Sequence, residues 1–97
     1  MDIPSPILQK AIARTSLTEK YTELTMELVE IKKRKASLWP EFRAKVSSDT
    51  QAEKIWSGTQ DGIREMELGY ILKATEKQLS AMKLEIDCLR DEARSQY

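Results

Sequence analysis

The chain of 97 residues carries 16 basic and 16 acidic side chains, so its formal net charge is zero although charged residues make up 33% of it. This length allows one small domain with a modest core, which argues against a large catalytic cleft, and a neutral chain exerts no long-range attraction on nucleic acid. Cys88 is the single cysteine and histidine is absent, which excludes an intramolecular disulfide and a Cys/His metal cluster.

The N-terminal half is predicted to form a long helix over residues 6–37. Ser5-Pro6 suits its start, because a capping hydroxyl precedes a proline in the first turn. Apolar residues then recur at steps of four and three, which is the heptad pattern of a helix that packs lengthwise on another. The members of this N-terminal seam are Leu17, Tyr21, Leu24, Leu28 and Ile31.

Upstream of Leu17 the pattern changes. The same register would place Lys10 and Arg14 in the core, whereas the apolar residues of this segment are Ile7, Leu8, Ala11 and Ile12. We therefore expect the register to slip, either through a stutter near residues 15–16 or through a separate short N-terminal helix.

Residues 38–58 are predicted to form a helical connector. Pro40 restricts the preceding Trp39 away from helical angles, which favours an end of the first helix near residue 37. The run from Ser47 to Thr50 is typical of a turn and helix cap, and Ser48 with Gln51 has capping-box spacing.

The C-terminal half is predicted to form a second long helix over residues 59–95. Its seam consists of Leu68, Leu72, Leu79, Met82, Ile86 and Leu89. Two seams of this kind are natural partners, so the predicted fold is all-α: an antiparallel, coiled-coil-like helical hairpin in a single domain of residues 1–97. A parallel coiled coil that pairs the C-terminal helices of two copies is an alternative that the pattern leaves open.

A second apolar stripe lies opposite the C-terminal seam, with Trp56, Ile63, Tyr70 and Leu84 seven or fourteen residues apart. Near the turn, Trp39 and Phe42 of the connector could fold over Trp56 and Ile63, whereas Leu84 needs the N-terminal segment or a second chain to cover it. A lone hairpin would also bury little core, so we expect self-association, most simply a dimer that forms a four-helix bundle. The predicted contact patch consists of Trp39, Phe42, Trp56, Ile63 and Tyr70.

Residue types that carry catalysis or bind metals are sparse. The acidic residues are dispersed among lysines on helical surfaces, no histidine is available to activate Cys88, and no glycine-rich phosphate loop is present. We therefore predict no catalytic residue, metal site, cofactor or small-molecule substrate.

A basic cluster interrupts this neutral pattern between residues 32 and 45. It consists of Lys32, Lys33, Arg34, Lys35, Arg43 and Lys45. With two aromatic residues interleaved, the cluster has the composition of a single-strand nucleic-acid contact, in which cations meet phosphates and rings stack on bases. The same charges also suit the solvated C-terminal end of a helix, where cations oppose the helix dipole, and we favour that interpretation.

Three segments of the C-terminal half, Trp56–Gly62, Leu79–Met82 and Glu92–Tyr97, resemble small uncharacterised coiled-coil proteins encoded by tailed bacteriophages. The resemblance implies a context of virion assembly, phage genome handling or interference with a host protein. It implies no binding or catalytic residue.

The function predicted from these features is a non-catalytic helical module for protein–protein interaction or assembly, with nucleic-acid binding through the basic cluster as the alternative. The N-terminus lacks the basic start and apolar run of a signal peptide, and no segment has the apolar length of a membrane span. With one cysteine, these features favour a cytoplasmic location, in a host cell or a virion if the chain is phage-encoded.

Overall fold

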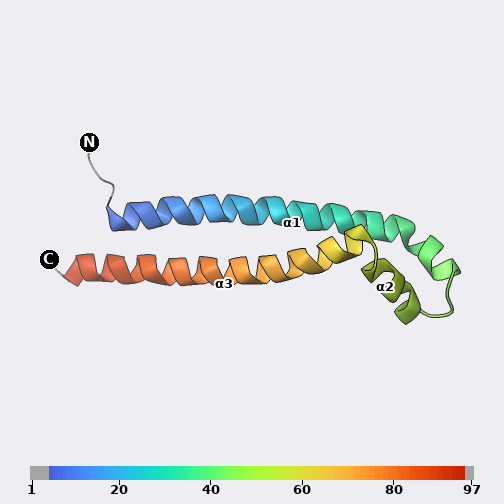
Figure 1. The fold of residues 1–97 in the computed structure, drawn as a ribbon. Helices are drawn as coiled ribbons and strands as arrows, with labels where there is room; N and C mark the ends of the chain where they lie inside the picture. Colours follow the sequence, from blue (N-terminus) through green and yellow to red (C-terminus); the bar gives the residue numbers. More distant parts are fainter. Residues whose placement is uncertain (1–4, 96–97) are drawn as a thin grey trace. The chain divides into compact units, whose positions relative to one another are not determined.

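The computed structural model describes residues 5–95, which form three helices: α1 (Pro6–Ala44), α2 (Asp49–Ser57) and α3 (Gln60–Ser95) (Figure 1). No strand is present among these residues. The all-α class and the helical connector between two long helices are therefore confirmed.

The start of α1 follows the expected capping pattern. The Ser5 hydroxyl accepts a hydrogen bond from the Leu8 N–H at 3.1 Å, and Pro6 occupies the first helical position, where no N–H is needed. The helix then passes through Thr15 and Ser16 without a break, which corrects the expectation of a separate short helix. The expected stutter is also absent among the described residues, because half-buried Lys10, Arg14 and Leu17 follow one another at heptad steps.

The heptad register of α1 also continues upstream of Leu17. Lys10 and Arg14 are half-buried at seam positions, whereas Leu8 and Ile12 are exposed. Lys10 tolerates its position because its Nζ donates to a Glu85 carboxylate oxygen on α3, so the aliphatic stem lies along the seam while the ammonium is paired.

The C-terminal end of α1 lies beyond the predicted boundary at residue 37. The helix includes Trp39 and Pro40 and ends at Ala44, although Pro40 cannot donate to the Ala36 carbonyl one turn before it. Ala36 is exposed, so water can satisfy that carbonyl. This extension packs Phe42 against the hydrophobic core, and the packing outweighs the local preference of the residue before proline.

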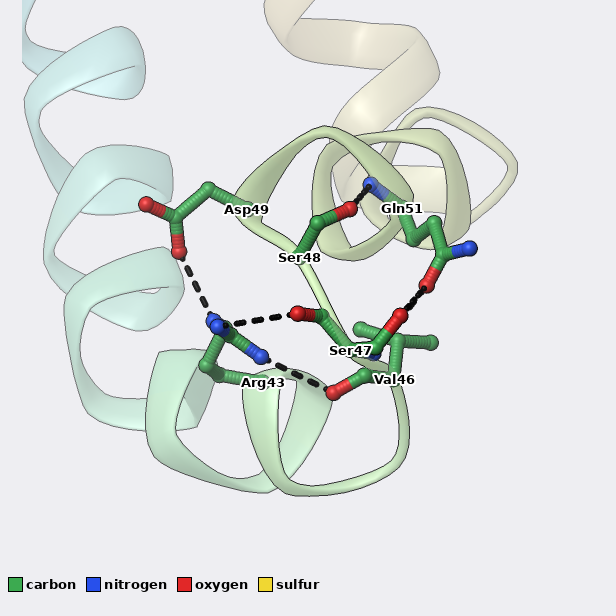
Figure 2. Close-up of polar contacts among 6 residues, drawn as sticks. All are labelled: Arg43, Val46, Ser47, Ser48, Asp49 and Gln51. Carbon is green, nitrogen blue, oxygen red and sulfur yellow. Dashed lines mark hydrogen bonds and ion pairs between the residues drawn. The ribbon is translucent and has the colours of Figure 1, made fainter.

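Two serines and a glutamine start α2. The Ser48 hydroxyl accepts from the Gln51 N–H at 3.2 Å, while the N–H and hydroxyl of Ser47 donate to Gln51 Oε1 at 3.0 and 2.9 Å (Figure 2). The predicted turn and cap at Ser47–Thr50 are therefore confirmed. The Gln51 side chain accepts from Ser47, the residue before the cap, and not from the cap residue Ser48 itself.

The junction between α2 and α3 is tight. The Thr59 hydroxyl donates to the Trp56 carbonyl at 2.6 Å and accepts from the Gly62 N–H at 3.0 Å, which caps α3. A Cβ on Gly62 would lie only 1.9 Å from the Trp56 carbonyl oxygen. Glycine is therefore required here for close approach of two backbones, not for an unusual φ angle.

The helices belong to two compact units. Of the described residues, the terminal unit contains 5–22 and 73–95, and the connector unit contains Glu23–Leu72. Both long helices contribute to each unit, because α1 passes from the first unit to the second and α3 passes back.

Within each unit α1 and α3 are antiparallel. In the terminal unit Lys10 pairs with Glu85, and the Tyr21 hydroxyl, further along α1, donates to Glu76, earlier in α3, at 2.6 Å. The connector unit shows the same order, since Glu27 pairs with Arg64 and residue 34 pairs with residue 61. The predicted antiparallel pairing of the two seams is confirmed.

Candidate interaction surfaces

The residues of both predicted seams face the interior of the α1–α3 pairs. Ile31, Leu68, Leu72 and Ile86 are buried, and Leu17, Tyr21, Leu24, Leu28, Leu79, Met82 and Leu89 are half-buried. In the connector unit Ile31, Trp56 and Leu68 form the buried cluster, with Leu24, Leu28 and Phe42 packed around it. These side chains hold the fold together and leave little apolar surface for another molecule.

One flank of the seam carries bidentate ion pairs in the connector unit. Arg64 donates to both carboxylate oxygens of Glu27 at 2.6 and 2.9 Å, and Arg34 donates to both oxygens of Asp61 at 2.8 and 3.0 Å. Hydrogen bonds from these guanidinium groups lower the pKa of Glu27 and of Asp61 below their ordinary values. The same bonds raise the pKa of Arg34 and Arg64, so the flank consists of ionised, mutually satisfied groups.

Most of the predicted basic cluster is engaged in contacts within the chain. Arg34 belongs to the pair just described, and the Lys33 ammonium lies 3.4 Å from Glu30. Lys32 and Lys45 are exposed and make no ion pair within the described part of the chain.

Lys35 is the most enclosed of these cations. Its Nζ donates to Glu53 Oε1 at 2.8 Å and lies 3.9 Å from a Glu65 oxygen. The ammonium also lies 5.6 and 5.7 Å from the ring centroids of Trp39 and Trp56, within the range of cation–π attraction. It therefore neutralises local carboxylates and faces aromatic rings, and is not presented to a phosphate.

Arg43 organises the end of α1. Its Nε donates to Asp49 Oδ1 at 2.9 Å, and its two terminal nitrogens donate to the carbonyl oxygens of Val46 and Ser47 at 2.8 and 3.3 Å (Figure 2). The planar fork thus satisfies carbonyls that follow the helix and fixes the turn to α2.

The predicted aromatic patch is divided between core and surface. Trp56 is only 1% exposed and packs against half-buried Phe42, while Trp39 is half-buried beside Lys35. The connector therefore covers Trp56, as one reading of the sequence allowed, and removes it from any partner surface. Ile63 is exposed and belongs to a different face.

That exposed face of α3 has a regular pattern. Ile63, Met66 and Tyr70 follow at steps of three and four, and Met66 and Tyr70 are 58% and 71% exposed. We call these residues the α3 outer face. In the terminal unit Leu84 is also exposed on this helix, 14 residues after Tyr70.

Sequence reasoning missed a matching face on α1. Met26 is 56% exposed and Val29 is partly exposed, with Glu23 and Glu30 on the same side of the helix. We call these four residues the α1 outer stripe. The three-residue step from Met26 to Val29, out of register with the seam, was the signal that could have revealed it.

The terminal unit contains a groove of about 610 Å³ on one flank of its seam. Ala11 and Ile86 line it, and its cations are Arg14 from α1 and Lys83 and Arg90 from α3. On the α1 side, the groove is lined by small residues at flanking positions where a coiled coil usually has long charged ones, and this leaves it open. These residues are Ala11, Thr15, Thr18 and Thr22.

Comparison with models of known families, with curated proteins and with solved structures finds no match for this chain. The phage context implied by the resemblance stays a prediction. None of the helices in the described part of the chain is long and apolar enough to cross a bilayer. Residues 5–95 also contain no group of three or more acidic or thiol side chains placed to hold a metal ion.

Proposed function

We propose that this protein is a non-catalytic helical interaction module that self-associates, most simply as a dimer with a four-helix arrangement. The observation that carries the proposal is the large exposure of apolar side chains on the outer sides of both long helices, above all Met26, Met66 and Tyr70. On each long helix the exposed apolar side chains recur at steps of three or four residues, as Met26 and Val29 do on α1 and Met66 and Tyr70 on α3. They therefore form a continuous stripe on each helix, which a second helix can cover.

Energetics support association. Among the residues whose burial the structure describes, the fully buried large side chains are Trp56, Ile31 and Leu68, all from the connector unit. Three such side chains make a small core for a chain of this length. Complete burial of one large apolar side chain contributes about 1.5–3 kcal/mol, so a partner that covers several exposed ones offsets much of the cost of ordering the chain.

Nucleic-acid binding, the alternative derived from the sequence, receives less support. Arg34, Lys35 and Arg43 already donate to carboxylates within the chain, and Lys33 lies beside Glu30. A phosphate would have to displace these partners, and the net charge of zero supplies no compensating attraction.

The test is the molar mass of the wild type in solution, measured by light scattering over a range of concentrations. We expect a mass well above the 11.2 kDa of one chain. In Met26→Ser/Tyr70→Ser, which removes one exposed apolar side chain from each helix, association should weaken because less apolar surface is buried. The control is Lys73→Ser/Lys77→Ser, which alters two exposed polar residues of α3. A wild type that remains at 11.2 kDa throughout would contradict self-association.

A further inference from the structure

The cations of the terminal-unit groove have no partners in the part of the chain that the structure describes. Lys83 and Arg90 are exposed and, like Arg14, make no ion pair or hydrogen bond through their side chains with any of residues 5–95. The Nε of Arg14 is buried without an acceptor among those residues. This contrasts with the connector unit, where Arg34 and Arg64 are paired with carboxylates.

The spacing along the α3 side of the groove is regular. Lys83 and Arg90 are seven residues apart, roughly 10 Å along a helix, and therefore point to the same side of α3. Ile86 lies between them in the floor of the groove. Glu19 and Asp87 also line the groove, which leaves it with a net positive charge.

The α1 outer stripe has the same spacing with opposite charge. Glu23 and Glu30 are seven residues apart, and exposed Met26 follows Glu23 by three residues, as Ile86 follows Lys83. Glu23 makes no ion pair within the described residues, and Glu30 makes only the 3.4 Å contact with exposed Lys33. An exposed pair of this kind contributes little and is easily replaced.

We infer that the α1 outer stripe of one copy docks in the terminal-unit groove of a second copy. Glu23 and Glu30 then face Lys83 and Arg90, while Met26 covers the apolar floor at Ile86. The inference rests on the proposed self-association and specifies which surfaces meet. The contact joins two different surfaces of the chain. When each copy docks its stripe in the groove of the other, a two-fold axis relates the two contacts and the assembly closes as a dimer.

A second copy suits the groove better than a small anion. The matched i, i+3, i+7 spacing supplies an apolar side chain between two carboxylates, and a free phosphate or carboxylate would leave the floor at Ala11 and Ile86 uncovered. Complementary charges also fix the register of two helices whose apolar faces alone would slide.

The experiment exchanges the charges. Lys83→Glu/Arg90→Glu and Glu23→Lys/Glu30→Lys each place like charges opposite each other in the docked pair. We expect each variant alone to raise the dissociation constant for self-association about 100-fold. An equimolar mixture of the two variants, and the chain that carries all four changes, should associate as tightly as the wild type because every contact is again between opposite charges.

The control is Lys73→Glu/Lys77→Glu, which makes the same change of charge on exposed residues of α3 away from the groove, and should leave association near wild type. If a reversed variant loses helicity, the glutamine versions of the same pairs replace it. A wild type that associates while both reversed variants keep its mass would overturn this docking and leave the proposed function standing. A wild type that stays monomeric would overturn both.

Discussion

Phe42 meets the indole of Trp56 edge-on, with ring centroids 6.0 Å apart and planes at 88°. This is a favoured geometry for two aromatic rings, because the positive edge of one faces the negative face of the other. The contact links the last turn of α1 to α2 and covers Trp56, whose ring lies 5.7 Å from the Lys35 ammonium. Trp56 is therefore the centre of the connector unit and not a contact residue for a partner.

Trp56→Ala should reduce the free energy of unfolding by about 3–5 kcal/mol, because it leaves a cavity where Ile31, Leu68 and Phe42 now pack. Thermal and urea denaturation followed by circular dichroism would measure the loss. Ile55→Ala is the control, since this neighbouring apolar side chain of α2 is 40% exposed and should contribute less to stability. Wild-type stability in Trp56→Ala would restore the interpretation drawn from the sequence, in which Trp56 is a surface anchor.

Gly62→Ala and Gly69→Ala should have opposite effects although both raise helix propensity. A methyl group on Gly62 meets the Trp56 carbonyl oxygen, and relief of that clash should cost about 1–3 kcal/mol of stability. A methyl group on Gly69 meets nothing within 4 Å, so it should stabilise α3 by roughly 0.5–1 kcal/mol. Urea denaturation of both variants checks the sign. A stabilising Gly62→Ala would show that the backbone of α3 does not approach the Trp56 carbonyl this closely.

The pair of Glu27 and Arg64 should make stability depend on pH in the acid range. The hydrogen bond from Arg64 lowers the pKa of Glu27 below its ordinary value of 4.5, so the stabilisation is present above about pH 4.5 and is lost as the pH falls through the lower, folded-state pKa. Asp61, whose pKa is lowered by Arg34, acts in the same direction.

Glu27→Gln should therefore be less stable than the wild type near pH 7, and the difference should shrink as the pH falls below 4.5, the ordinary pKa of a glutamate, towards the lower folded-state pKa. Urea denaturation at several pH values measures it. Glu41→Gln removes the same charge from an exposed residue without an ion pair among residues 5–95, and is the matched control. A wild type and Glu27→Gln that differ equally at every pH would show that the pair is not formed.

Arg43→Lys should lower stability by about 1–2 kcal/mol although it keeps the charge. A lysine cannot reproduce the fork that bonds Asp49 and the carbonyls of Val46 and Ser47 together. Lys45→Ala removes a whole charge nearby but no hydrogen bond within the described chain, and should cost less. If Lys45→Ala is the more damaging change, positive charge rather than geometry matters at this end of α1.

The pairing of the long helices was predictable because it depends on a repeated pattern. Leu68, Leu72 and Ile86 are buried at the positions that a heptad assigns to a seam. A pattern of this kind survives local exceptions, since many contacts determine the register together. The same redundancy explains why α1 keeps its register where Lys10 replaces an apolar residue.

The details that the sequence did not predict depend on single tertiary contacts. The helical conformation at Trp39 and Pro40 follows from the packing of Phe42 one turn later, which no local preference reveals. The ion pairs of the basic cluster could not be predicted from the sequence either, because the carboxylate partners of Arg34 and Lys35 lie 27 and 18 residues away in the chain. Trp56 and Tyr70 likewise share one heptad position in the sequence, but Trp56 is buried and Tyr70 is exposed.

The position of both tryptophans has a spectroscopic consequence. Trp39 and Trp56 belong to the connector unit, and the described part of the terminal unit contains none. Tryptophan fluorescence therefore reports the melting of one unit, whereas circular dichroism at 222 nm averages over all three helices. Coincident transitions from the two probes would mean that the chain unfolds as a single cooperative structure, and an earlier loss of helical signal would mean that the ends of α1 and α3 separate first.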